Sequence, residues 1–278
     1  MNFSVSPDSG ATRHDQKPEA PSLRVEGVSV SFPTPEGELK ALESVSFGVV
    51  SGEFVCLVGP SGCGKSTLLR TLAGLLQPNQ GRVWLDGKPV VAPHRQVGLV
   101  FQQANLMPWR TVLGNVMLPL ELIDMPKARA RWRAKVLIDL VGLSEFANAY
   151  PSDLSGGMAQ RVAIARALAR DPDVLLLDEP FGSLDALTRE RMGQELLRIW
   201  RLQRKTVLMV THSVSEAVFL SDRVLVLSPR PGTVAATEPV ELPRPRDLAL
   251  METEEFGALA GRVRAAIEEA QLQQEWRN

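Results

Sequence analysis

The sequence is poor in cysteine, and this excludes a fold held together by disulfides. Cys56 and Cys63 are the only cysteines among 278 residues. Neither has a second Cys or a His near it at the spacing of a metal site, so we interpret both as free thiols.

The chain also lacks an apolar run long enough to cross a membrane. Its longest mostly apolar stretch without a charge, residues 111–120, is interrupted by Gly114 and Pro119. A spanning helix needs about 20 such residues. The first ten residues contain no basic start followed by an apolar core, so we expect no secretory signal and a cytosolic location.

No charge of one sign is in excess. Lys and Arg number 31 against 32 Asp and Glu, for a net charge of -1, so nothing indicates non-specific binding to nucleic acid. With 44% hydrophobic and 23% charged residues, the composition is that of a globular protein. The length fits one large domain or two small ones.

The pattern along the chain predicts an α/β fold. Residues 1–22 are rich in Ser, Pro, Asp and Gly, which is typical of a flexible tail. Apolar residues alternate between 23 and 49, as in half-buried antiparallel strands. Three continuous apolar runs follow at 54–58, 174–177 and 207–210, which is the pattern of parallel strands buried on both faces.

Two helical regions complete the predicted architecture. Strand signals vanish between about 105 and 170, where the clearest helices are expected at 128–141 and 160–169, so we interpret this stretch as a helical insertion. A C-terminal extension, 243–278, carries an amphipathic helix whose apolar face is formed by Phe256, Leu259, Val263, Ile267 and Ala270.

A phosphate-binding loop is the strongest motif. The pattern G-x-x-x-x-G-K-S follows a predicted buried strand and precedes a helix expected at 67–76. Its backbone N–H groups and the helix N-terminus, which includes Thr67, favour a phosphate. Lys65 would hold the β- and γ-phosphates and Ser66 a Mg²⁺ ion. The residues are Gly59, Pro60, Ser61, Gly62, Cys63, Gly64, Lys65 and Ser66. The alternative is a chance glycine-rich turn.

A pair of carboxylates ends the second apolar run. Asp178 and Glu179 follow residues 174–177 at the sheet edge where ligands bind in such folds. We expect Asp178 to hold Mg²⁺ and Glu179 to act as the base that polarises the attacking water. The alternative is an Asp-Glu pair that only caps the turn before Pro180.

Ser155, Gly156 and Gly157 form a second candidate anion site ahead of a helix expected at 161–169. Together with the phosphate loop and the Asp-Glu pair, this loop resembles the signature loop of ABC ATPases. In that family two protomers face head to tail, and each signature loop completes the partner's ATP site. A loop that only caps a helix is the alternative.

The resemblance implies roles for four further residues. Gln102 resembles the glutamine that contacts Mg²⁺ or water, with Gln103 as its confusable neighbour. Asp185 resembles the aspartate that reaches across the dimer, and His212 the histidine at the γ-phosphate, although a structural histidine is the alternative. Phe32 stands where the family places an aromatic residue on the adenine, or else is a core residue.

Further motifs resemble the ATPases of nitrate, sulfonate and taurine importers. They are residues 105–112, 178–189, 227–232 and 242–247. Ala159 and Ser213 depart from the usual Arg and Asp of that group, at positions that hold no phosphate. We interpret the basic residues of 127–135 as a solvated helix face and Cys63 as incidental to the loop's chemistry.

The sequence therefore predicts an α/β P-loop NTPase of the ABC cassette type, with an antiparallel β layer and a helical insertion. The resemblance covers about 23–242. It implies an ATP-hydrolysing importer subunit that uses ATP and Mg²⁺, pairs with a second copy of itself and works at the cytoplasmic face of the membrane. Its partners would be permease subunits and, indirectly, a substrate-binding protein. The rival is a soluble ABC ATPase acting on nucleic acid or ribosomes.

Overall fold

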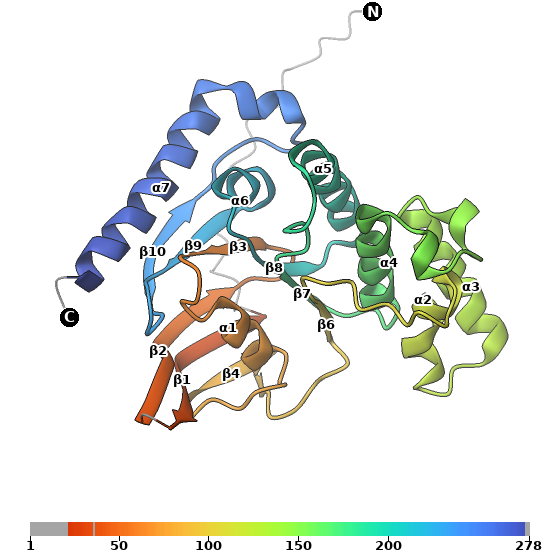
Figure 1. Cartoon of the computed structure of the whole chain (residues 1–278), viewed down its shortest axis with the longest axis horizontal. Helices are drawn as coiled ribbons and strands as arrows, with labels where there is room; N and C mark the ends of the chain where they lie inside the picture. Colours follow the sequence, from red (N-terminus) through yellow and green to blue (C-terminus); the bar gives the residue numbers. More distant parts are fainter. Residues whose placement is uncertain (1–21, 36, 276–278) are drawn as a thin grey trace, which may run out of the picture.

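The computed structural model describes residues 22–35 and 37–275, so the tail predicted at 1–22 lies outside the described residues except for Ser22. Two β-sheets and the helices around them form the body, and a group of helices extends from one end of it (Figure 1). Among the described residues, no helix is both long and apolar enough to span a membrane.

The larger sheet has six strands in the order β10-β9-β3-β8-β7-β6. All neighbouring pairs are parallel except β10 with β9. The strands are β3 (Phe54–Val58), β6 (Val97–Val100), β7 (Val174–Asp178), β8 (Thr206–Val210), β9 (Arg223–Leu227) and β10 (Val234–Pro239). The three predicted apolar runs are β3, β7 and β8, which confirms that interpretation.

Burial on both faces explains why these runs are continuous. In β3, Val55 and Leu57 pack into one hydrophobic cluster, whereas Phe54, Cys56 and Val58 pack into the other. Side chains alternate between the faces of a strand, so a strand covered on both sides needs apolar residues at every position.

One face of the larger sheet is covered by a four-stranded antiparallel layer of order β2-β1-β4-β5 and by α1. The layer comprises β1 (Leu23–Thr34), β2 (Gly37–Val49), β4 (Gln80–Leu85) and β5 (Lys88–Pro89). Val28 and Val45 of this layer pack with Leu68 of α1 (Lys65–Leu72). The predicted antiparallel strands between 23 and 49 are thus confirmed.

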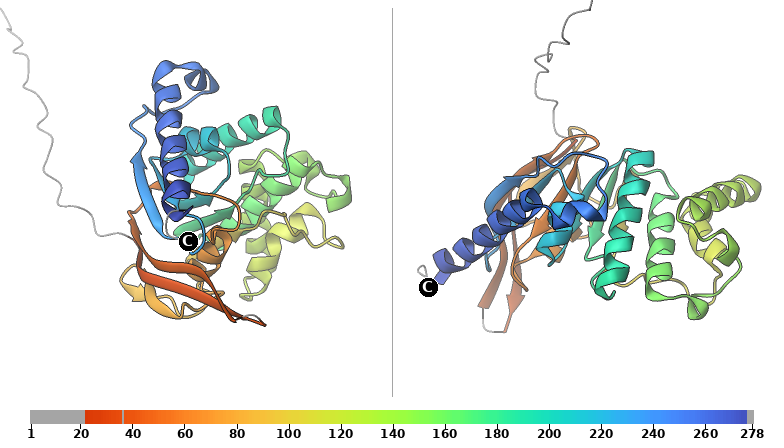
Figure 2. Two further views of the ribbon diagram at one scale, coloured as in Figure 1. Left: turned by 60° about the vertical axis from the view of Figure 1, so that its left-hand side comes forward. Right: turned by 90° about the horizontal axis from the view of Figure 1, so that it is seen from above.

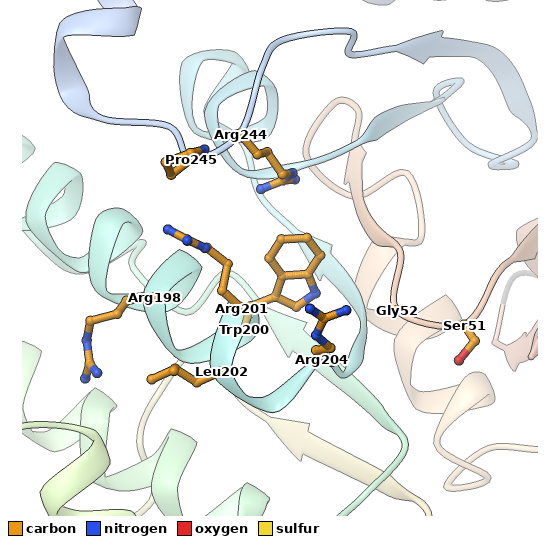
Figure 3. Close-up of a pocket in the computed structure, with 9 residues that line it drawn as sticks. All are labelled: Ser51, Gly52, Arg198, Trp200, Arg201, Leu202, Arg204, Arg244 and Pro245. Atoms are coloured by element: carbon orange, nitrogen blue, oxygen red, sulfur yellow. The ribbon is translucent and has the colours of Figure 1, made fainter. Parts of the chain in front are cut away.

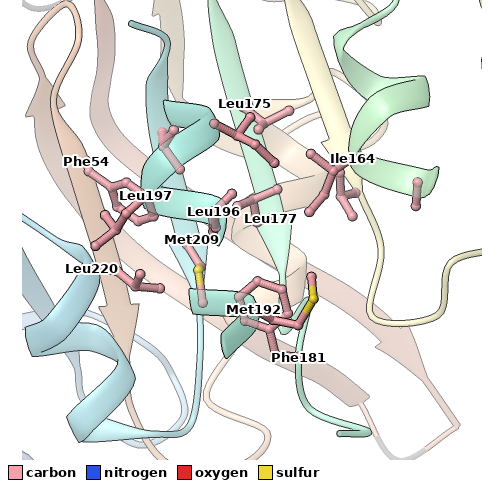
Figure 4. Close-up of a cluster of buried hydrophobic side chains, with 14 of the residues drawn as sticks. Phe54, Ile164, Leu175, Leu177, Phe181, Met192, Leu196, Leu197, Met209 and Leu220 are labelled. Atoms are coloured by element: carbon pink, nitrogen blue, oxygen red, sulfur yellow. The ribbon is translucent and has the colours of Figure 1, made fainter. Parts of the chain in front are cut away.

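Helices cover the other face. Strand residues such as Phe54, Leu177 and Met209 meet side chains of α4 (Gly156–Leu168), α5 (Ala186–Gln203) and α6 (Val214–Leu220) in one cluster (Figure 4). The helix residues of this cluster include Ile164, Leu196, Leu197 and Leu220. The core therefore lies on both sides of one central sheet.

The stretch predicted as a helical insertion contains α2 (Val112–Glu121), α3 (Lys127–Leu140) and α4, with short 3-10 turns at Ser144–Phe146 and Pro151–Asp153. The three helices pack on one another, and α2 and α3 extend beyond the sheet from α4, which packs on it (Figure 2). The helix predicted at 128–141 is α3. The start predicted for α4, at 160 or 161, is wrong: Ser155 Oγ accepts a hydrogen bond from Met158 N at 3.3 Å, so the helix begins at Gly156.

The helix of the phosphate loop is also shifted from its predicted bounds of 67–76. It begins at Lys65 and ends at Leu72. Gly74 has φ +73°, and a Cβ there would lie 2.3 Å from the carbonyl oxygen of Ala92. A glycine in the left-handed region is a common helix ending, and here it lets the chain turn against 92–93.

The C-terminal segment packs against the core. After a 3-10 turn at Leu248–Glu252, α7 (Glu254–Glu275) lies against α6, β9 and β10 (Figure 2). Phe256, Leu259 and Val263 are buried, as the amphipathic pattern predicts.

Arg246 joins the C-terminal segment to α6. Its Nη1 donates to the carbonyls of Val218, Phe219 and Ser221, and its Nη2 to those of Val240 and Leu242. Burial lowers the pKa of this guanidinium to about 10. The buried guanidinium thus supplies hydrogen-bond donors to the backbone carbonyls at the end of α6.

Both cysteines are free and buried. Burial raises the pKa of the Cys56 and Cys63 thiols, which disfavours the reactive thiolate. Neither thiol is therefore poised as a nucleophile.

Candidate nucleotide site

The predicted phosphate loop runs from the end of β3 to the start of α1. Gly64 has φ +105°, and a Cβ there would lie 2.8 Å from the backbone oxygen of Ala41, so the loop requires glycine at this position. The Lys65 side chain is buried, and its Nζ donates to the carbonyls of Gly59 and Pro60 at 2.8 Å each. The ammonium is therefore held within the loop.

The N-terminus of α1 suits an anion. No side chain caps this helix, whereas Thr111, Ser155, Asp185 and Ser213 cap α2, α4, α5 and α6. The first N–H groups of a helix have no partner within it, and its dipole is positive at this end. With Lys65 beside them, these groups fit the phosphates of a nucleotide.

Ser66 and Asp178 meet across the site. Ser66 Oγ donates to Asp178 Oδ1 at 3.1 Å, which joins two segments that lie 112 residues apart in the sequence. Burial raises the pKa of Asp178, the bond from Ser66 lowers it, and the charge of Glu179 raises it again. A hydroxyl and a carboxylate side by side are the hard oxygen ligands that Mg²⁺ prefers, so the donor set fits that ion.

Glu179 adopts an uncommon backbone conformation beside His212. Its φ is +44°, a strained value for a residue with a side chain. Its N–H donates to Val210 O at 2.9 Å, and its Oε2 lies 3.2 Å from His212 Nδ1. The strained turn thus aims the carboxylate at the histidine.

Gln102 reaches the same cluster. A Cβ built on Gly182 would lie 3.4 Å from Glu179 Oε2 and 3.5 Å from Gln102 Nε2, so both side chains flank this glycine. Gln160 of α4 donates to the carbonyl of Phe101 at 3.2 Å. This bond connects the residue before Gln102 to the helical insertion. The structure therefore brings Gln102, Glu179 and His212 together.

Glu216, which the sequence did not assign, joins the residues on either side of His212. Thr211 Oγ1 donates to Glu216 Oε2, and Ser213 Oγ accepts from Glu216 N at 3.3 Å. Burial raises the pKa of the Glu216 carboxyl. The sequence does carry a signal for this arrangement, because Ser213 and Glu216 have the S-x-x-E spacing of a capping box.

Arg230 is another site residue that the sequence did not assign. Its Nε and Nη2 donate to the carbonyl of Gly62 in the phosphate loop, at 3.0 and 2.8 Å. Nearby, Gly232 N donates to Ala41 O at 2.9 Å. The turn after β9 therefore supports the loop from the side.

The predicted signature residues form a second group. Cβ atoms built on Gly156 and Gly157 would lie 3.5 Å from Leu184 and Thr188 side chains. Asp185 Oδ1 accepts from Thr188 N at 3.0 Å, a bond that lowers the pKa of this exposed carboxyl. In Figure 1, α4 lies at the far side of the larger sheet from α1.

Phe32 lies on β1 opposite Leu39 and packs, half-buried, against the cluster under the antiparallel layer. This packing agrees with the alternative that Phe32 is a core residue. Adenine stacking by this ring stays a prediction.

These features define a class of protein. A glycine-rich loop between a buried parallel strand and a helix, with its Ser hydroxyl bonded to an Asp at the end of a nearby strand, is the site of a P-loop nucleoside triphosphatase. The chain belongs to the ABC transporter family, whose pattern matches residues 42–182. It is an ATPase subunit of that family.

Known proteins similar to the chain also belong to this family of ATP-binding subunits. An uncharacterised ABC transporter ATP-binding protein of Methanocaldococcus jannaschii is 52% identical over 84% of this chain and 88% of its own length. The taurine import ATP-binding protein of Rhizobium johnstonii is 51% identical over 77% and 82%. The nitrate import ATP-binding protein of Synechococcus elongatus is 46% identical over 81% and 83%.

The fold has solved counterparts as well. A dimeric post-hydrolysis structure of an ATP-binding cassette, bound to ADP and Pi, has a TM-score of 0.71 and 36% identity, over 79% of this chain and 99% of that one. The likeness confirms the predicted cassette fold.

Proposed function

We propose that this subunit energises an importer for a small solute of the nitrate, sulfonate and taurine type. The support is the identity to import ATP-binding proteins for taurine and nitrate. Nitrate, sulfonates and taurine all carry a compact oxyanion group. The permease and the binding protein would select the solute, while this chain would supply the energy of ATP hydrolysis.

One observation carries the assignment of the catalytic roles: Gln102, Glu179 and His212 lie together next to Asp178, which meets Ser66 of the phosphate loop. Lys65 and the backbone N–H groups of residues 59–67, except Pro60, which has none, would bind the phosphates of ATP. Ser66, Asp178 and Gln102 would hold Mg²⁺, which neutralises phosphate charge when bound. Glu179 would accept a proton from water, and His212, 3.2 Å from it, would orient the carboxylate and contact the γ-phosphate.

A second copy of the chain would complete the site. Gly156 and Gly157 of α4 pack against Leu184 and Thr188, which flank Asp185, and α4 and α1 belong to the hydrophobic clusters on opposite faces of the larger sheet. Ser155, Gly156, Gly157 and Asp185 would therefore not serve the phosphate loop of their own chain. In a head-to-tail dimer they would meet the nucleotide of the partner. The solved dimeric cassette is a precedent for pairing of this fold.

The helical insertion would dock on the permease. Several large apolar side chains are exposed on it, although it packs its other side on the core. Trp109 is 72% exposed, Leu122 76% and Trp132 67%. Exposed apolar residues grouped on one projecting part favour a protein partner, and such docking would hold the chain at the cytoplasmic face of the membrane.

Replacing Glu179 tests the catalytic assignment. We expect Glu179→Gln to bind ATP as the native chain does, because the phosphate loop and Asp178 remain, and to lose about 10²- to 10⁴-fold in turnover. With ATP and Mg²⁺ it should accumulate as a dimer in gel filtration. Glu241→Gln, an exposed glutamate outside the site, is the matched control. Native turnover in Glu179→Gln would remove this residue from the catalytic role.

The importer assignment needs a separate experiment. The tagged chain should co-purify with membrane-embedded permease subunits after mild solubilisation. Trp132→Ser and Leu122→Ser should weaken this association and leave ATP hydrolysis by the isolated subunit unchanged. Purification with ribosomes or DNA instead would favour the non-transport alternative.

A further inference from the structure

A cavity of about 700 Å³ lies at the end of the larger sheet opposite the phosphate loop. Ser51 and Gly52 precede β3 and Arg204 precedes β8, so the cavity is at the amino ends of these strands. A five-residue strand separates the two edges by about 16 Å. The cavity is therefore distinct from the nucleotide site.

Arginine dominates the lining of this cavity. Arg198, Arg201 and Arg204 come from the end of α5, and Arg244 comes from the turn after β10. The other lining residues are Ser51, Gly52, Trp200, Leu202 and Pro245, so no carboxylate is among them. Figure 3 shows Arg201, Arg204 and Arg244 around the indole of Trp200, while Arg198 points away.

Two of these charges are balanced within the protein. Arg244 Nε donates to Asp222 Oδ1 at 2.9 Å, and Arg198 is paired with Glu195. The side chains of Arg201 and Arg204 form no hydrogen bond or ion pair with the described part of the chain, and both residues are exposed. The cavity thus presents two uncompensated positive charges, which complement a dianion.

The aromatic side of the cavity is already in place. Trp200 Nε1 donates to Lys205 O at 2.9 Å, and the ring of Phe54 packs against the indole in a T-shaped pair, with 5.8 Å between centroids. The guanidinium of Arg244 lies over the ring at 4.3 Å. A guanidinium held over an indole offers its outer face to a planar ring, and the guanidinium groups of Arg201 and Arg204 offer charge to an anionic group.

We propose that this cavity binds a phosphate monoester with a planar ring, of the size of a nucleoside monophosphate. The cavity volume lies within the range of small-molecule sites, about 300–1,000 Å³. The phosphate dianion pairs with Arg201 and Arg204, and the ring stacks on the guanidinium of Arg244, which is held over Trp200. The alternative explanation is that the arginines only stabilise α5, because positive charges are favourable at the negative C-terminal end of a helix dipole. In that case the cavity would bind no ligand.

Calorimetric titration with AMP tests the proposal on the full-length chain carrying Lys65→Ala, which removes the main phosphate contact of the ATP site. We expect saturable binding of one AMP per chain, and at least about tenfold weaker binding of adenosine, which lacks the phosphate. No saturable AMP binding, or equal affinity for adenosine, overturns the proposal. Because Lys65→Ala weakens the ATP site and the assay measures binding alone, failure of this proposal and failure of the proposed transport function are distinguishable.

The cavity is assigned by a second pair of variants in the same background. Arg201→Ala with Arg204→Gly should weaken AMP binding by about tenfold or more. Arg204 has φ +48°, so glycine fits its backbone and the variant should fold, as a thermal melt will check. Arg170→Ala with Arg264→Ala removes two exposed arginines elsewhere and should bind AMP normally. Unchanged affinity in the first pair overturns the proposal.

Discussion

Arg230 offers a sharp test of how the phosphate loop is held. Two of its nitrogens donate to the single carbonyl of Gly62, from a turn that lies 168 residues away in the sequence. Arg230→Ala deletes both bonds and leaves Lys65, Ser66 and Asp178 in place. The loop then has to be ordered by the nucleotide itself, so the loss should appear as weaker ATP binding.

The magnitude follows from the two bonds. Each net hydrogen bond contributes about 0.5–1.5 kcal/mol, and exposure of the guanidinium favours the lower half of that range. A total of about 1–2 kcal/mol corresponds to roughly 5- to 30-fold in the dissociation constant of ATP. Because the catalytic cluster is untouched, KM should rise by a similar factor while kcat stays near the native value.

Nucleotide titration and steady-state ATPase assays measure both quantities. Arg230→Lys keeps the charge but lacks the forked donor, so its affinity should fall between those of the native chain and the alanine variant. Arg170→Ala, exposed and distant, controls for net charge. An ATP affinity within twofold of native in Arg230→Ala would refute the supporting role of this arginine.

Three further predictions follow from the site and the fold. Lys65→Ala should lose ATP binding by at least about tenfold, because the phosphates lose their main counter-charge; a nucleotide titration measures it. A mixture of Lys65→Ala with Ser155→Arg should regain some ATPase activity, since one interface of the mixed dimer is intact; normal turnover by Ser155→Arg alone would contradict a site completed by the partner. Gly74→Ala should destabilise the protein by about 2–4 kcal/mol in denaturant unfolding, from its positive φ and the contact with Ala92 O, whereas Gly261→Ala, in open space on α7, should not.

The sequence predicts the parts of this fold that depend on local pattern. Runs such as 174–177 are continuous because both faces of the strand are buried, so every residue of the run is apolar. The phosphate loop is also predictable from the sequence, because the positive φ at Gly64 requires glycine and the motif therefore shows it. β6 and β9 were not predicted; β6 is short and contains Gly98, so its pattern is weak.

Contacts between distant segments were harder to foresee. Arg230 looks like an ordinary loop residue until the turn after β9 is placed beside Gly62. The start of α4 depends on one hydrogen bond from Met158 N to Ser155 Oγ, which apolar periodicity does not register. Both cases depend on polar contacts, whereas the pattern of hydrophobic residues predicts only which positions are buried.

The buried guanidinium of Arg246 has a consequence for any shortened form of this protein. Cutting the chain after residue 242, where the family resemblance ends, would leave the carbonyls of Val218, Phe219 and Ser221 without this donor. Each unpaired buried carbonyl costs about 1–3 kcal/mol. Because α6 starts two residues after His212, the C-terminal segment anchors the same helix that leaves the catalytic cluster. A minimal ATPase made from this chain must therefore extend at least through Arg246.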